Sequence, residues 1–242
     1  MPPLKENRLY RSFLLPIQLV LLMWAIHLVQ WLTGLNLGLL GAVYPREADG
    51  LLGIITSPLL HADFGHIMAN TPPLFVMSVI LLFFYRSVAV PAFLMIYILT
   101  GVAVWALARS GPHVGASGVI YGLVAFVFWT GIFRRNLKSI VLALLVLFYY
   151  GSLFLGIVPT SGKETVSWES HLLGALVGIF IAFLYKDRVE HDEVKEKPSW
   201  ELEASEEERS FLDPRTFEQT KSARENDRNG GNTTGRWYQS NT

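Results

Sequence analysis

The fold is set by residues 115–133, whose sequence GASGVIYGLVAFVFWTGIF contains no charged side chain. At 1.5 Å of rise per residue, a helix of this length extends for roughly 30 Å, the thickness of a bilayer's hydrocarbon core. Within it, Gly118 and Gly122 lie four residues apart, a small-xxx-small spacing that lets a second helix backbone approach closely. The stretch therefore predicts a membrane-spanning helix packed tightly against a neighbour.

Five further stretches have similar length and apolar character, and they lie at residues 14–32, 66–85, 88–107, 140–159 and 168–185. The composition agrees, because 51% of the chain is drawn from AVILMFWYC and the mean hydropathy is +0.36, which is too apolar for an ordinary soluble domain. We therefore predict an all-α polytopic membrane protein, with a six-helix membrane domain at residues 14–185. No small-residue cleavage site follows the first span, so we expect that span not to be a cleavable signal peptide.

The distribution of charge predicts the orientation, because short loops rich in Lys and Arg stay in the cytoplasm. With residues 1–13 inside, the inner segments hold seven cations and the outer segments hold three, so we expect both ends to be cytoplasmic. Residues 186–242 carry 10 Lys or Arg and 14 Asp or Glu but few apolar anchors, and we predict a disordered cytoplasmic tail. The inner cations are Lys5, Arg8, Arg11, Arg86, Arg134, Arg135 and Lys138, and the outer ones are Arg46, Arg109 and Lys163.

The connection between the first two spans, residues 33–65, is unusually long and rich in leucine and isoleucine. Loops of this length are usually functional or disordered, and disorder fits poorly with so many apolar side chains. We expect the connection to pack into the outer half of the bilayer or against the bundle.

Polar side chains are costly inside a membrane, so those in the spans are candidates for function. His66 and Asn70 lie one turn apart at the start of the second span, Ser117 lies at the start of the fourth, and His171 lies about one turn into the sixth. All four fall near the outer ends of spans that begin outside. A serine hydroxyl needs a base to remove its proton, and histidine is the commonest one. We predict Ser117 as nucleophile and His171 as its base.

Acyl transfer also requires donors for an oxyanion, and His66, Asn70 and the backbone N–H of Ser117 are available near one another. The Gly118 and Gly122 face is matched by a second glycine pair in the sixth span, which predicts the close helix approach that the serine and histidine need. Tyr121, one turn after the serine, is placed to wall the imidazole from beneath. The residues expected to support or line the site are Gly115, Gly118, Tyr121, Gly174 and Gly178.

At this point the sequence resembles the rhomboid family of intramembrane serine proteases. The resemblance rests on HADFGHIMAN at residues 61–70, on GASG at residues 115–118 followed by Tyr121, and on HLLG at residues 171–174 followed by Gly178. It implies a six-helix core and a serine–histidine pair without an acidic third member, with the span-two His and Asn binding the oxyanion. It also implies substrates that are membrane proteins cut in or near a transmembrane segment. By position, these roles fall to Ser117, His171, His66 and Asn70.

Two positions depart from the family pattern. Ser170 stands where relatives often have alanine, and Tyr44-Pro45-Arg46 stands where many carry a Trp-Arg pair, so Arg46 is expected to do part of the same anchoring. His61 and His113 lie in outer segments near the site, where substrate-binding or loop-anchoring roles are open.

The same residues leave room for other functions, some of which the sequence disfavours. A zinc site using His61, His66, His113 and His171 is disfavoured because there is no H-E-x-x-H helix. An aspartyl protease is disfavoured because it would need two aspartates in the spans, and the predicted spans contain none. We expect no metal and no cofactor, and the chain has no cysteine. A non-catalytic rhomboid-like protein that holds membrane segments is the main alternative, and a transporter or channel is a third.

The expected partners are transmembrane protein substrates and the lipid bilayer, without nucleic acid, and the oligomeric state is left open. The expected location is a bacterial inner membrane, with the active site toward the outer face.

Overall fold

The computed structural model describes residues 7–158, 167–188, 190 and 220–222. Residues 1–193 form one compact unit, and residues 220–222 are the described part of a second unit, residues 194–242. Across the described residues the regular secondary structure is helical, apart from one isolated antiparallel bridge between Val43 and His113. The predicted disordered tail, residues 186–242, lies mainly outside the described residues, at residues 189, 191–219 and 223–242, so it stays a prediction.

Within the described residues, four helices are long and apolar enough to cross a bilayer, and they match four of the predicted spans. These are α1 (Asn7–Thr33), α4 (Phe64–Phe84), α5 (Ala89–Leu107) and α6 (Ser117–Arg134). Two shorter apolar helices, α7 (Leu137–Tyr150) and α8 (Trp168–Leu184), occupy the positions of the fifth and sixth predicted spans. The prediction of an all-α membrane fold is therefore confirmed, whereas the count of six spans stays a prediction.

The fifth predicted span, residues 140–159, differs from the structure. The α-helix ends at Tyr150 and continues as a 3-10 helix, η3 (Gly151–Ile157), and Pro159 lies outside the described residues. Only Gly151 and Ser152 interrupt the apolar run at this point, so hydropathy does not reveal the change of helix type. It coincides with Gly151, a weak helix former, and the carbonyls of Leu153 and Gly156 in η3 accept side-chain hydrogen bonds from α6 and α8.

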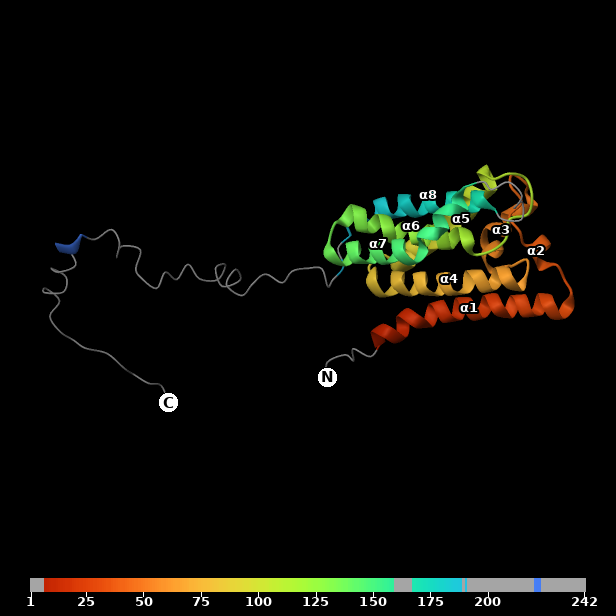
Figure 1. The fold of residues 1–242 in the computed structure, drawn as a ribbon, viewed down its shortest axis with the longest axis horizontal. Helices are drawn as coiled ribbons and strands as arrows, with labels where there is room; N and C mark the ends of the chain where they lie inside the picture. Colours follow the sequence, from red (N-terminus) through yellow and green to blue (C-terminus); the bar gives the residue numbers. More distant parts are fainter. Residues whose placement is uncertain (1–6, 159–166, 189, 191–219, 223–242) are drawn as a thin grey trace. The chain divides into compact units, whose positions relative to one another are not determined.

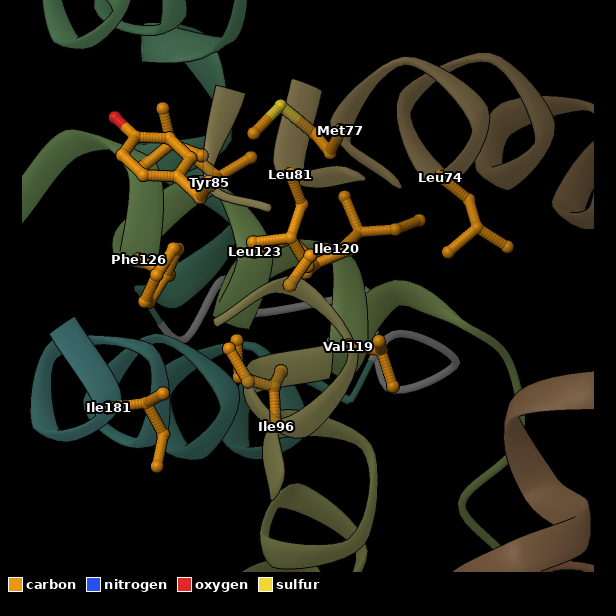
Figure 2. Packing of buried hydrophobic residues seen from close by; sticks show 14 of the residues in the cluster. Leu74, Met77, Leu81, Tyr85, Ile96, Val119, Ile120, Leu123, Phe126 and Ile181 are labelled. Carbon is orange, nitrogen blue, oxygen red and sulfur yellow. The ribbon is translucent and has the colours of Figure 1, made fainter. Parts of the chain in front are cut away.

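Helix α6 contacts α4, α5, α7 and α8, and it is buried along most of its length. Figure 2 shows Leu81, Ile96, Leu123 and Ile181, one from each of α4, α5, α6 and α8, gathered in the core, and each is fully buried. Figure 1 shows α1 beside α4 at the edge of this bundle, where the Trp24 indole donates a hydrogen bond to Thr71 at 3.0 Å. The serine-bearing helix therefore lies inside the bundle.

Glycines let α8 lie directly against α6. A Cβ on Gly174 would overlap the carbonyl oxygen of Gly118, and a Cβ on Gly178 would overlap that of Gly122. Since successive glycines on one helix face successive glycines on the other, α6 and α8 run in the same direction at close range. Their first turns, which hold Ser117 and His171, are therefore brought together.

The connection from α1 to α4 contains four short helices, α2 (Leu37–Leu40), η1 (Asp49–Leu51), α3 (Gly53–Thr56) and η2 (Ser57–Leu59). In Figure 1, α2 and α3 lie at one end of the bundle. The Arg46 amide donates to the Trp105 carbonyl at 2.9 Å, and its guanidinium donates to the Ala108 carbonyl at 2.7 Å. The connection is thereby fastened to the C-terminal end of α5.

At the other end of α6, Glu190 joins three parts of the chain. Its carboxylate accepts hydrogen bonds from the Ser87 amide at 3.0 Å and the Ser87 hydroxyl at 2.6 Å, and it lies 3.8 Å from Arg134. The side chains of Arg134 and Glu190 are only 3% and 4% exposed. Glu190, a short distance beyond the end of α8, is thus anchored to the α4–α5 turn and to the last turn of α6.

Candidate active site

Ser117 is the first residue of α6, and the loop before it is held by the α1–α4 connection. The Gly115 amide donates to the Ser57 carbonyl at 2.9 Å, and Val43 and His113 exchange two backbone hydrogen bonds of 3.0 Å. Ser117 itself is half-buried. Its backbone N–H lies in the first turn of the helix, where amides have no acceptor within the helix and favour negative charge. The loop therefore presents both the hydroxyl and a set of backbone donors.

His171 lies within hydrogen-bond distance of this hydroxyl. Its Nε2 is 2.9 Å from Ser117 Oγ, and its Nδ1 is 2.9 Å from the Gly156 carbonyl oxygen. A carbonyl can only accept, so Nδ1 carries the hydrogen and Nε2 is left as an acceptor for the serine hydroxyl. The imidazole is thus held in the tautomer that a general base requires.

Tyr121 fixes the plane of that imidazole. The two rings stack with centroids 4.1 Å apart and an angle of 5° between planes, and the tyrosine hydroxyl donates to the Leu153 carbonyl at 2.8 Å. Tyr121 also lines an apolar cavity of about 190 Å³ between α6, α7, η3 and α8. Stacking and hydrogen bonding together leave the His171 ring little freedom to turn.

His66 and Asn70 lie in the first two turns of α4, beside the loop that precedes Ser117. The Asp63 carboxylate caps this helix by accepting from the His66 amide at 2.8 Å. The Asn70 side-chain nitrogen donates to the His66 carbonyl at 2.8 Å. Gly115 adopts φ = +107°, and a Cβ there would lie 2.6 Å from both Cε1 and Nε2 of His66. The imidazole therefore rests directly against the glycine.

His61 is buried behind His66, with its ring edge-on to the His66 ring at a centroid distance of 4.9 Å. Burial lowers the pKa of His61 to about 3, and the neighbouring His66 acts in the same direction. The Gln30 side chain donates to the His61 backbone carbonyl at 3.2 Å, which ties the connection to α1. His61 is thus an uncharged residue of the packing around the site.

Several residues of the site were not found by sequence reasoning. The carbonyls of Gly156 and Leu153 orient His171 and Tyr121, yet a backbone carbonyl is common to every residue and gives no signal. One signal was present, because a Cβ on Gly156 would overlap the Tyr121 hydroxyl and glycine is otherwise disfavoured inside an apolar helix. Ser167 is a further such residue, because its hydroxyl bonds both the His113 ring and the Ser170 hydroxyl.

Within the residues that the structure describes, no three His, Asp or Glu side chains are placed to hold a metal ion. Arg46, the residue compared with the family's Trp-Arg pair, bonds the Ala108 carbonyl and the Ser110 hydroxyl. Arg46 therefore contacts the start of the loop that leads to Ser117, and these two bonds do not involve Ser117 or His171.

Comparison with known proteins gives matches across this region. The family model described as Rhomboid domain matches residues 48–188, a span that contains all of the candidate residues. Uncharacterized protein Rv1337 of Mycobacterium tuberculosis (strain ATCC 25618 / H37Rv) is 40% identical over 172 residues, covering 68% of this chain and 71% of that protein. Uncharacterized protein ML1171 of Mycobacterium leprae (strain TN) is 37% identical over 145 residues, covering 57% of each chain.

A further match is the Bacillus subtilis (strain 168) protein named "Putative rhomboid protease YdcA". It is 27% identical over 194 residues, which cover 72% of this chain and 86% of that protein.

Proposed function

Because this chain belongs to the rhomboid family, whose model matches more than half of its length, we propose that it is an intramembrane serine endopeptidase. Its substrates are other membrane proteins, cut within or beside a transmembrane segment. The observation that carries the proposal is the Ser117 Oγ to His171 Nε2 distance of 2.9 Å, with the opposite ring nitrogen bonded to a carbonyl. No acidic third residue is needed, because the Gly156 carbonyl sets the tautomer.

In the first half-reaction, Ser117 Oγ attacks the carbonyl carbon of the scissile peptide bond while its proton passes to His171 Nε2. The negative charge that forms on the peptide oxygen is stabilised by the Ser117 N–H, by His66 and by Asn70. A side-chain amide nitrogen carries two hydrogens, and the His66 carbonyl takes one of those on Asn70, so the other serves the oxyanion. His171 then gives its proton to the leaving nitrogen as the C–N bond breaks.

In the second half-reaction, water attacks the ester on Ser117 and His171 takes a proton from it. The bond from the acyl carbon to Ser117 Oγ breaks, the proton returns to Oγ, and the product leaves as a carboxylic acid. Tyr121 stabilises the imidazole orientation in both halves through its stacked ring. Gly115 leaves room for the His66 ring, and the glycine contacts of α6 with α8 keep the serine and histidine in reach.

We further propose that α7 and α8 complete six spans and that residues 14–185 form the membrane domain. Residues 1–13 and 186–242 are then cytoplasmic, and the site faces the outer surface of a bacterial inner membrane. Four apolar helices and family membership make the protein an integral membrane protein, and the cation distribution supports the orientation.

The chain contains no cysteine, so single cysteines report orientation without background. We expect Ser110→Cys to react with a membrane-impermeant maleimide on intact cells and Asp187→Cys to react only after permeabilisation, because both positions are exposed at opposite ends of the bundle. Labelling of Asp187→Cys alone on intact cells would reverse the proposed orientation.

The test of activity uses the purified full-length protein in lipid vesicles with a panel of single-span reporters. We expect product fragments whose new ends, determined by mass spectrometry, lie in or next to the reporter's span. Ser117→Ala and His171→Ala should each abolish cleavage, and Ser117→Ala should also lose labelling by a fluorophosphonate. Cleavage that persists in Ser117→Ala would contradict the proposal. Reporter capture without product by the wild type would favour the non-catalytic binding function instead.

A further inference from the structure

His113 lies in the loop that leads to Ser117, outside the set of residues assigned to the reaction. It is 6% exposed, and both of its ring nitrogens are hydrogen-bonded. Nε2 lies 2.9 Å from the Arg109 carbonyl oxygen at the start of the same loop, and Nδ1 lies 2.7 Å from Ser167 Oγ, the residue that caps α8. One buried side chain thus bridges the loop of the nucleophile and the helix of the base.

The partners determine the direction of each hydrogen bond. The Arg109 carbonyl can only accept, so His113 Nε2 carries the hydrogen and Nδ1 accepts from the Ser167 hydroxyl. Ser167 Oγ in turn accepts from the Ser170 hydroxyl at 2.7 Å and from the Ser170 amide at 3.3 Å. A continuous chain of donors therefore runs from Ser170, the neighbour of His171, to the loop before Ser117.

The His113–Ser167 pair has the same sequence separation as the proposed catalytic pair. His113 and Ser167 are 54 residues apart in sequence, as are Ser117 and His171. Because α6 and α8 run in the same direction, the contacts follow one another along the two segments. The His113–Ser167 bond comes first, the serine–histidine bond follows, and the glycine contacts come after it.

The glycine contacts join α6 and α8 only on the C-terminal side of Ser117 and His171, the inner side in the proposed orientation. On the outer side, the loop and α8 are also joined by Arg109 and Glu169, with 3.3 Å between Nε and Oε1, but the arginine side chain is 46% exposed. An ion pair with so exposed a partner contributes little. His113 supplies the buried hydrogen bonds on that side.

We propose that His113 is a positioning residue: through Ser167 and Ser170 it holds the first turn of α8 to the loop before α6, and so sets the alignment of His171 with Ser117. The inference rests on the proposed function. It predicts that losing the bond to Ser167 lowers the rate of the chemical step, because misalignment of a reacting pair by a fraction of an ångström is costly. Substrate binding would be largely unaffected.

Two substitutions at this position separate the two bonds. In His113→Asn, the amide oxygen lies where Nδ1 was and can still accept from Ser167, whereas the bond to Arg109 is lost. In His113→Gln, the amide nitrogen reaches toward the Arg109 carbonyl and the bond to Ser167 is lost. His113→Phe keeps an aromatic ring and loses both.

The experiment measures kcat and KM on a single-span reporter with the full-length protein, together with the rate of fluorophosphonate labelling. We expect kcat and the labelling rate to fall about tenfold in His113→Phe and His113→Gln, while KM stays within about twofold of the wild-type value. His113→Asn, which keeps the bond to Ser167, should retain most of the wild-type kcat and labelling rate. Thermal unfolding in detergent checks that each variant is folded. If His113→Phe does not fold, Ser167→Ala and its rescue by Ser167→Thr provide the same comparison.

Equal activity of His113→Asn and His113→Gln in folded proteins would overturn the inference, as would a loss confined to KM. The proposed function fails by a different result, namely a wild type that neither cleaves nor labels, or one that matches Ser117→Ala. A wild type that depends on Ser117 while the two His113 variants behave alike would therefore reject the positioning role alone.

Discussion

At the scale of single residues, the site depends on backbone groups and small side chains as much as on the polar residues themselves. Gly115 shows this most directly, because it combines a backbone conformation that disfavours side chains with direct contact to the His66 ring. Gly111 in the same loop has φ = +130°, but a Cβ added there would meet no atom within 4 Å. Both glycines have a positive φ that would strain any other residue, but only Gly115 has a neighbour that a side chain would strike, so substitutions at the two positions separate strain from contact.

We expect Gly115→Ala to lower kcat about 100-fold, since the added methyl group would displace His66 from the oxyanion. Gly111→Ala should lose about 1–3 kcal/mol of stability from backbone strain but keep kcat per folded molecule. The measurement is reporter cleavage normalised to the folded fraction. Similar kcat losses in both variants would mean that strain, and not contact with His66, controls the site.

At the scale of elements, the decisive contact is that of α8 with α6. The two helices approach so closely that the carbonyls of Gly118 and Gly122 occupy the space where side chains of Gly174 and Gly178 would stand. Helix association in a membrane depends on such packing, because lipid provides no hydrophobic driving force between helices. The same contact that stabilises the bundle therefore brings Ser117 to His171.

Gly178→Ala is expected to destabilise the protein by about 2–3 kcal/mol, because the methyl group forces the helices apart. Gly151→Ala is the matched control, since its new Cβ would meet only Leu147 at 3.8 Å and its φ is −58°. We expect Gly151→Ala to keep the stability of the wild type or raise it by up to about 1 kcal/mol. Thermal unfolding in detergent micelles compares them, and equal stability of the two variants would contradict the close helix contact.

At the scale of the whole molecule, the membrane unit is tied together at both ends. The α1–α4 connection joins the loop before Ser117 at one end, through Val43 and Ser57. At the other end, Glu190, which lies beyond α8, bonds Ser87 and pairs with Arg134, and the side chains of Glu190 and Arg134 are both buried. A buried charge that loses its partner is costly, so this second tie should matter for stability and not for the distant chemistry.

We expect Glu190→Gln to lower the stability by about 2 kcal/mol, because the buried ion pair with Arg134 and the charged acceptor of the two Ser87 hydrogen bonds would both be lost. Asp187→Asn, which changes an exposed carboxylate three residues earlier, should have little effect. Thermal unfolding provides the comparison, and kcat per folded molecule should match the wild type in both. A stability loss in Asp187→Asn as large as that in Glu190→Gln would refute the specific anchoring.

Length, hydropathy and local spacing established much of this protein without coordinates. They indicated an all-helical membrane protein, located four of its long helices, and marked Ser117, His171, His66 and Asn70 as candidates, because span length and turn spacing are local properties of a chain. The folded chain was needed for the rest. In the folded chain the fifth helix ends at Tyr150, the Gly156 carbonyl bonds His171, and Ser167 bonds His113. These contacts join residues distant in sequence through backbone groups or common hydroxyls, so their pairing depends on how the helices pack in three dimensions.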